Sequence, residues 1–178
     1  MNRIRLKDKE FELFISFEEI NKAITLMAAR IKADADGKNP LFVGILNGAF
    51  MFIAELMLQL NGAYELAFAR YSSYHGMETT EQMQEIMPVH ADVNGRNLIL
   101  LEDIVDSGYT MSWLKKKLYE AGAAEVKIAA MLFKPDALRY DAKPDYTGME
   151  IPNDFIVGHG LDYDGLGRSF RDIYKIVD

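Results

Sequence analysis

The chain contains no cysteine, and none of its apolar stretches approaches the length of a membrane-spanning helix. Without cysteine it can form neither a disulfide nor a thiolate nucleophile. The segment 1–5 is not followed by the apolar core of a secretory signal. The three histidines, at positions 75, 90 and 159, are not spaced as zinc ligands. These absences favour a soluble cytoplasmic protein.

Basic residues are also in deficit, with 20 lysines and arginines against 27 aspartates and glutamates and a net charge of -7. This balance argues against a general nucleic-acid or anionic-membrane partner, although a local basic pocket for phosphates remains compatible with it. The length of 178 residues and the hydrophobic content of 49% suffice for a real core. We expect one domain over residues 1–178.

The rest of the chain is organised around the stretch Asn97–Met111. Its apolar run Leu98–Leu101 predicts a buried strand of a parallel sheet, and a small-residue turn then leads to a predicted helix over Met111–Ala121. The N-terminus of a helix placed in this way presents free N–H groups and the positive end of its dipole. The stretch therefore predicts a phosphate site.

Three carboxylates, Glu102, Asp103 and Asp106, stand beside that predicted site. Acidic side chains near a phosphate call for ligand hydroxyls, a divalent cation such as Mg²⁺, or a developing positive charge. A phosphorylated sugar bound with Mg²⁺ would satisfy all three. The alternative is that Asp106 and Ser107 only cap the following helix while the other acids are solvated.

The remaining pattern predicts an α/β fold. Ser16 and Glu19 form a capping box that opens a helix, and a polar stretch, Ser72–Pro88, reads as a functional lid or as disordered. We expect a central, mostly parallel sheet of about five strands with helices on both faces. The expected strands span 40–46, 64–71, 98–101, 125–133 and 155–157, with a further helix over 50–60.

The segment Glu102–Thr110 (Glu-Asp-Ile-Val-Asp-Ser-Gly-Tyr-Thr) resembles the phosphoribosyl-pyrophosphate (PRPP) signature of the type I phosphoribosyltransferases. Within that family the chain resembles the hypoxanthine-guanine branch of purine salvage over nearly its whole length. The other agreeing stretches are 44–50, 72–74, 132–135 and 154–163. The resemblance implies transfer of a phosphoribosyl group from PRPP to a 6-oxopurine, with Mg²⁺, by a homo-oligomer (dimer or tetramer). It also implies a small hood, built from the N-terminal arm and the segment after Pro144.

The resemblance assigns the sugar and phosphate contacts to the organising stretch. Glu102 and Asp103 would hold the ribose hydroxyls and Mg²⁺, and Asp106 would take or share the proton of the purine N7. The 5′-phosphate would lie on the backbone and hydroxyls of a loop made of Asp106, Ser107, Gly108, Tyr109 and Thr110.

Four residues from later stretches are assigned to the base and to the second metal. Lys134 would donate to the exocyclic O6, which favours 6-oxopurines over adenine. Phe155 would stack on the purine, and Ile156 would supply backbone contacts at the N1 and C2 edge. Asp162 would lie at the base pocket and bind a second Mg²⁺ that carries pyrophosphate.

The pyrophosphate contacts are implied for Leu46, Asn47 and Gly48 in one loop and for an arginine in another. Counting from Asp162 selects Arg168, with Arg171 as a competing match. Two further residues, Ser73 and Tyr74, would belong to a lid that keeps water from the reacting sugar.

The chain departs from the family pattern at two positions. Asn47 stands where relatives usually carry a basic residue, which predicts weaker pyrophosphate affinity, and the Leu46–Asn47 bond is expected to be cis. His159 replaces a more familiar tyrosine, and we interpret it as a neutral surface change.

Three other functions are compatible with parts of the pattern. A xanthine-preferring enzyme would differ only in backbone geometry at the C2 edge of the base. A regulatory protein could keep the fold and bind PRPP without catalysis. A flavodoxin-like receiver domain also places acids at strand ends, but it does not account for the Ser107–Thr110 cradle or for Lys134.

Overall fold

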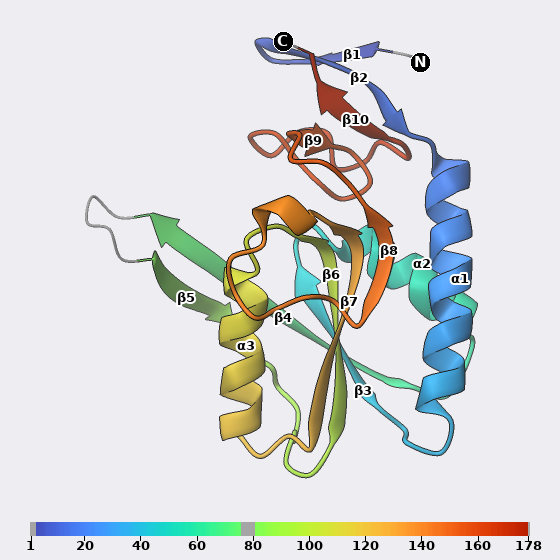
Figure 1. Ribbon diagram of the computed structural model, residues 1–178, viewed down its shortest axis with the longest axis vertical. Coiled ribbons are helices and arrows are strands. Elements are labelled where there is room, and N and C mark those ends of the chain that lie inside the picture. The colour runs from blue at the N-terminus through green and yellow to red at the C-terminus, as the bar shows by residue number, and fades with distance from the viewer. Residues whose placement is uncertain (1–2, 76–80, 178) are drawn as a thin grey trace.

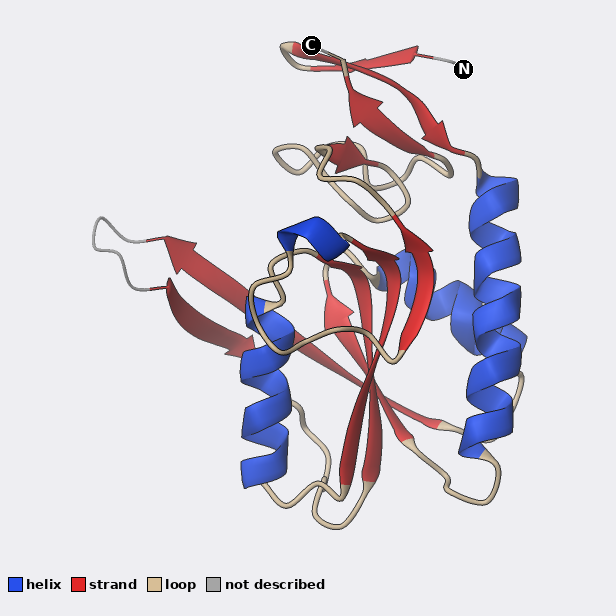
Figure 2. Ribbon diagram, viewed as in Figure 1, coloured by secondary structure: helices blue, strands red, loops and turns tan. Residues whose placement is uncertain are grey.

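The structure is a computed structural model that describes residues 3–75 and 81–177. Its main sheet has six strands, and a smaller four-stranded sheet lies above one edge of it (Figures 1 and 2). Neighbouring strands of the main sheet are parallel except at β4 and β5. In spatial order these strands are β5 (Glu81–Met87), β4 (Glu65–His75), β3 (Leu41–Leu46), β6 (Asn97–Val105), β7 (Glu125–Phe133) and β8 (Tyr146–Glu150).

The helices cover both faces of the main sheet, as the sequence predicts. α1 (Phe17–Ala35) and α2 (Phe50–Leu60) pack together on one face, and α3 (Tyr109–Glu120) covers the other (Figure 2). α1 begins with the predicted capping box, in which the Ser16 hydroxyl accepts from the Glu19 N–H and the Glu19 carboxylate accepts from the Ser16 N–H. A single turn of 3₁₀ helix, Pro135–Ala137, follows β7.

The central strand β6 is buried through the apolar run Leu98–Leu101. It lies between β3 and β7 in a sheet whose two faces are covered by helices. It is longer than predicted, because it continues to Val105 and so includes Glu102 and Asp103. These two neighbouring carboxylates therefore stand at the carboxyl end of the strand, and their side chains hydrogen bond to each other.

The hood is an antiparallel sheet that joins both ends of the chain. Its strands are β1 (Arg3–Leu6), β2 (Lys9–Ile15), β10 (Ile173–Ile176) and β9 (Ile156–Val157), in that spatial order. A small core of its own, built on Phe11 and Tyr174, lies beneath it. The hood covers the edge at which the parallel strands end (Figure 1).

Three expectations about the fold need correction. The main sheet has six strands instead of about five. It gains β5 and also Tyr146–Glu150, which pairs with β7 and so does not belong to the hood, whereas the predicted strand 155–157 pairs with β10 in the hood sheet. The stretch Ser72–Pro88 is largely the end of β4 and the antiparallel strand β5, with residues 76–80 outside the described part. β10 was not predicted.

In the described part of the chain, no helix has the length and apolarity that crossing a membrane requires.

Candidate active site

The loops that carry the predicted site residues meet at one edge of the main sheet. β3, β6 and β7 run parallel, so their carboxyl ends lie together, and the hood faces them (Figure 1). The loops after β3 and β6 each lead directly into a helix, α2 and α3. Two adjoining recesses open here.

The smaller recess, of about 120 Å³, lies at the N-terminus of α3. Gly108 is the N-cap of α3 with a φ of +83°, and a Cβ there would lie 2.8 Å from Leu138 Cδ1. Only glycine fits this turn without strain. The Ser107 carbonyl accepts from the N–H groups of Arg139 and Tyr140, which fixes the loop. The recess is lined by Glu102, Ile104, Val105, Asp106, Ser107, Gly108, Tyr109, Thr110 and Met111, so the loop expected to hold a phosphate is assembled around it.

The larger recess, of about 360 Å³, collects residues from four of the five stretches, at the sheet edge and in the hood, and we call it the cleft. Eight of its ten lining residues were named by sequence analysis, and Ile104 and Leu161 were missed. Both are apolar residues inside stretches that the analysis singled out, but neither carries a group that signals chemistry. The lining residues are Gly48, Asp103, Ile104, Asp106, Lys134, Phe155, Ile156, Leu161, Asp162 and Arg168.

The structure brings Lys134 and Asp106 into contact across the cleft. The Lys134 Nζ lies 3.2 Å from the Asp106 Oδ2, and its side chain is almost fully buried while that of Asp106 is 53% exposed. The Lys134 N–H also donates to the Val105 carbonyl at 3.0 Å, which ties the end of β7 to the end of β6. An ammonium and a carboxylate are therefore presented together to a ligand.

Phe155 presents an aromatic surface beside this pair. Its side chain is 47% exposed, and its ring is supported from the hood by Phe11 and Tyr163, with centroids 6.3 and 5.9 Å away. Its neighbour Ile156 is buried in β9, so the backbone there is fixed by the hood sheet. An exposed ring held rigidly in this way suits stacking on a flat ligand.

The two candidate arginines occupy different places. Arg168 lines the cleft, where its guanidinium lies 2.7 Å from Asp162 Oδ1 and donates to the Gly160 carbonyl at 2.7 Å. The Arg171 guanidinium instead lies 4.2 Å from the centroid of the Phe17 ring. This placement favours Arg168 as the pyrophosphate ligand, and the assignment stays a prediction.

The loop after β3 approaches the carboxylates closely. The expected cis peptide bond between Leu46 and Asn47 is present. A Cβ on Gly48 would lie 1.7 Å from the Asp103 Oδ2, so this position also requires glycine. Asn47 is exposed, and the next residue, Gly48, lines the cleft in its place.

Glu102 and Asp103 are held in a setting that disfavours negative charge. Burial raises the pKa of Glu102 well above its usual range, and the neighbouring Asp103 raises it further. Burial likewise raises the pKa of Asp103, against hydrogen bonds from Glu102 and from the Ile104 N–H. No group of three or more acidic or histidine side chains in the described residues could hold a metal ion unaided. Two carboxylates fit Mg²⁺, which is commonly bound by one or two carboxylates together with substrate phosphates and water.

Two predictions concern residues outside or apart from the cleft. The predicted lid residues Ser73 and Tyr74 lie at the end of β4, and their side chains are outside the described part of the structure. The interpretation of His159 as a surface change is wrong, because its side chain is only 1% exposed and lies beneath the hood.

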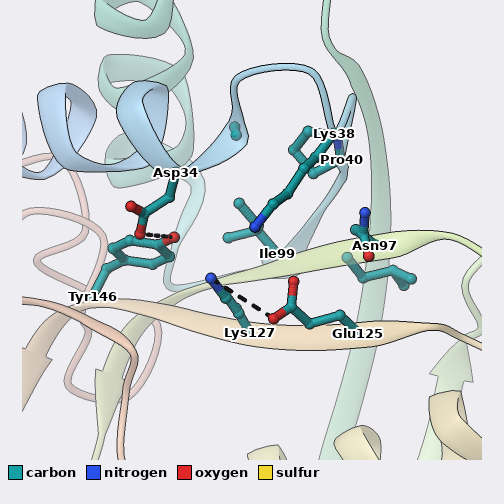
Figure 3. Close-up of a pocket in the computed structure, with 10 residues that line it drawn as sticks. Asp34, Lys38, Pro40, Asn97, Ile99, Glu125, Lys127 and Tyr146 are labelled. Carbon is teal, nitrogen blue, oxygen red and sulfur yellow. Dashed lines mark hydrogen bonds and ion pairs between the residues drawn. The ribbon is translucent and has the colours of Figure 1, made fainter.

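A further recess lies at the opposite edge of the sheet, where β6, β7 and β8 begin (Figure 3). Its volume is only about 10 Å³. The Tyr146 hydroxyl donates to Asp34 at 2.8 Å, and the Lys127 ammonium lies 3.8 Å from Glu125 (Figure 3). Such a volume holds about one water molecule.

Known proteins resemble this chain in both sequence and structure. Residues 16–164 match the family described as phosphoribosyl transferase domain. The hypoxanthine-guanine phosphoribosyltransferase of Streptococcus pneumoniae R6 is 40% identical over 85% of each chain, and that of Lactococcus lactis subsp. lactis is 40% identical over 91% of this chain and 89% of the relative. A crystal structure of a hypoxanthine phosphoribosyltransferase from Staphylococcus aureus superposes with a TM-score of 0.88 at 29% identity, covering 93% of this chain and 91% of the other.

Proposed function

The chain belongs to the phosphoribosyl transferase domain family, and from that premise we propose that it is a hypoxanthine-guanine phosphoribosyltransferase. It transfers the phosphoribosyl group of PRPP to hypoxanthine or guanine, which yields IMP or GMP and pyrophosphate. The observation that carries this proposal is the cleft, in which Lys134, Asp106 and Phe155 surround a space beside the N-terminus of α3. A base site and a phosphate site are thus adjacent.

PRPP would bind with its 5′-phosphate in the smaller recess. The loop 106–110 supplies backbone N–H groups and hydroxyls there, and the dipole of α3 favours an anion. The ribose would then lie over the end of β6, within reach of Glu102 and Asp103. This placement directs C1 of the sugar toward the cleft.

The base would enter the cleft with one face on the Phe155 ring. Lys134 would donate to its O6, and the Asp106 carboxylate would accept the proton of N7. As the ring nitrogen bonds to C1, the bond from C1 to pyrophosphate breaks, and the proton lost from N7 goes to Asp106. Because Lys134 already touches Asp106, both groups can contact the same edge of the purine.

Pyrophosphate would leave toward the loop 46–49 and Arg168. Arg168 is oriented by Asp162 and by the Gly160 carbonyl, so its positive charge is already in place. Glu102 and Asp103 would hold one Mg²⁺ and Asp162 a second. The bound cations would supply charge neutralisation for the pyrophosphate and for the buried carboxylates.

The test is nucleotide formation by the purified protein given PRPP, Mg²⁺ and one base at a time. We expect IMP and GMP from hypoxanthine and guanine, with far less AMP from adenine. A higher rate with xanthine would establish the xanthine-preferring alternative. PRPP binding without any product would instead establish a non-catalytic PRPP-binding regulator.

We also infer a homo-oligomer, a dimer or tetramer, and a cytoplasmic location. Phe50 and Leu58 on α2 are large apolar side chains exposed by 44% and 77%, so the outer surface of α2 is a candidate for the contact between subunits. Analytical ultracentrifugation measures the oligomeric state directly.

A further inference from the structure

His159 is a buried histidine that the proposed mechanism does not use. It lies in the hood loop between β9 and β10 with a φ of +49°, and its N–H donates to the Phe170 carbonyl at 2.8 Å. Its Nδ1 is 3.1 Å from the Arg171 carbonyl oxygen. A carbonyl oxygen can only accept, so Nδ1 carries a hydrogen and Nε2 is the atom that faces away from it.

The Nε2 of His159 points at Glu55 on α2. It lies 3.3 Å from the Glu55 Oε2, and the His159 side chain is 1% exposed. Both atoms are buried, and neither has another hydrogen-bond partner among the described residues. With Nδ1 already a donor, a neutral imidazole would place a lone pair against the carboxylate. The contact is favourable only when one proton lies between the two side chains.

The surroundings of the pair come from α1 and from the end of the hood loop. The Phe17 ring lies 6.3 Å from the His159 ring, and the Arg171 guanidinium lies 4.2 Å from the centroid of the same Phe17 ring. Asp172 accepts from the Phe17 N–H at 2.8 Å, which closes the start of α1 onto the hood. Glu55 and Arg171 also interact electrostatically, so the pair is enclosed by groups that hold it in one geometry.

The pair connects the two loops that would receive pyrophosphate. Glu55 is in the second turn of α2, directly after the loop 46–49. On the other side, Gly160 follows His159 and presses on that loop so closely that a Cβ would lie 1.9 Å from the Gly48 carbonyl oxygen. The Gly160 carbonyl in turn accepts from Arg168. A single set of contacts thus runs from α2 through His159 to the cleft arginine.

We propose that His159 and Glu55 form a positioning pair that holds the hood loop with Asp162 and Arg168 against the loop 46–49, and so shapes the pyrophosphate site. The inference rests on the proposed function and assigns two residues to its pyrophosphate half. Neither side chain lines the cleft, so the pair acts through Gly160 and Arg168. The purine half depends on Phe155 and Lys134, which are fixed by other contacts.

The experiment compares His159→Leu, Glu55→Leu, the double variant and His159→Gln with the unaltered protein, and uses the exposed His90→Leu as a matched control. For each protein we would measure the KM values for PRPP, for hypoxanthine and, in the reverse reaction, for pyrophosphate, together with kcat and the melting temperature. We expect the leucine variants to raise the KM values for PRPP and pyrophosphate by about tenfold, with kcat and the KM for hypoxanthine changed by less than about twofold. The double variant should be no worse than either single variant. His159→Gln retains a donor toward Glu55 and should recover most of the loss.

Unchanged KM values for PRPP and pyrophosphate in folded leucine variants would overturn the proposal. So would an equal loss in all parameters that follows the melting temperature. Should His159→Leu fail to fold, Glu55→Leu alone decides by the same criteria. If the unaltered protein forms no nucleotide, the proposed function fails. Calorimetric titration with Mg²⁺-pyrophosphate then tests the positioning role of His159 and Glu55. Weaker binding by Glu55→Leu than by the unaltered protein supports that role, and equal binding overturns it.

Discussion

The two edges of the main sheet are both lined by charged side chains, but they differ in how those charges are arranged. At the amino ends of the strands, Asp34 accepts a hydrogen bond from Tyr146 and Lys127 lies beside Glu125, in a recess of about 10 Å³ (Figure 3). At the carboxyl ends, the cleft has a volume of about 360 Å³ and keeps exposed chemical groups such as Asp106. Only the second arrangement leaves charge and space for a ligand.

The difference follows from the direction of the parallel strands. Each strand ends in a loop that leads into a helix N-terminus or into the hood, and these loops converge on one edge. The opposite edge receives helix C-termini and short turns, where polar side chains neutralise one another. Charges are paired at both edges, but only the pairs Lys134–Asp106 and Arg168–Asp162 line a space that a ligand can enter.

Among the changes at the carboxyl edge, Asp106→Ala should lower activity the most. Loss of the proton acceptor should lower kcat/KM for hypoxanthine on the order of a hundredfold or more. The matched change at the opposite edge, Asp34→Ala, should cost about 1 kcal/mol of stability through the lost Tyr146 hydrogen bond and leave kcat/KM within about twofold. Steady-state kinetics and thermal unfolding of both variants check the pair, and comparable activity losses would contradict the distinction between the edges.

Lys134→Met should have the next largest effect. It removes a charge-assisted hydrogen bond to the O6 of the base, which is worth about 1.5–3 kcal/mol, so kcat/KM for hypoxanthine should fall roughly 10- to 100-fold. Adenine offers no acceptor at that position, so its low rate should not fall in parallel. Competition between the two bases measures the ratio. A ratio equal to that of the unaltered protein would show that Lys134 does not read O6.

The double change Glu102→Gln with Asp103→Asn should lower activity about tenfold and yet stabilise the protein without Mg²⁺. Because burial raises both pKa values, the folded protein holds these protons more tightly than the unfolded chain does. Stability is therefore lost as the pH rises from the ordinary carboxyl range through the raised values. Amides do not ionise, so the variant should gain about 1 kcal/mol at pH 7 and less at pH 5. Calorimetric unfolding at both pH values measures this gain, and a variant less stable at pH 7 would contradict the prediction.

Asn47→Lys should have the smallest effect. A cation on this exposed position would attract pyrophosphate through solvent, so the KM for pyrophosphate should fall by roughly threefold, or less than 1 kcal/mol. Reverse-reaction kinetics at low ionic strength checks this, with Asn61→Lys at the far end of α2 as the control. The same KM in both variants would mean that the missing charge at position 47 has no consequence.

The parts of the fold that sequence analysis predicted are those specified locally. The bounds of α2 and β7 agree with the prediction, since each is an apolar segment with clear turn residues at its ends. The site residues were assigned because a long motif and four shorter stretches resemble the phosphoribosyltransferase pattern, and their individual roles stay predictions. Because β3, β6 and β7 are parallel, the stretches at their carboxyl ends meet at one edge of the sheet.

The parts that were missed depend on contacts between distant segments. β10 is a strand because it pairs with β2, more than 150 residues earlier in the chain. β8 is short and contains Gly148, where a Cβ would lie 2.5 Å from the Met131 carbonyl oxygen, so its pairing depends on β7. β5 is polar and pairs only with the end of β4. His159 was misread for the same reason, because its burial depends on α1 and α2 meeting the hood.

The most direct test of this account is a crystal structure of the protein with IMP. The account predicts that the purine lies on the Phe155 ring with O6 near Lys134, and that the 5′-phosphate lies on the loop 106–110 at the N-terminus of α3. IMP bound elsewhere, or bound in the cleft with its phosphate away from α3, would contradict the assignment of the carboxyl edge as the active site.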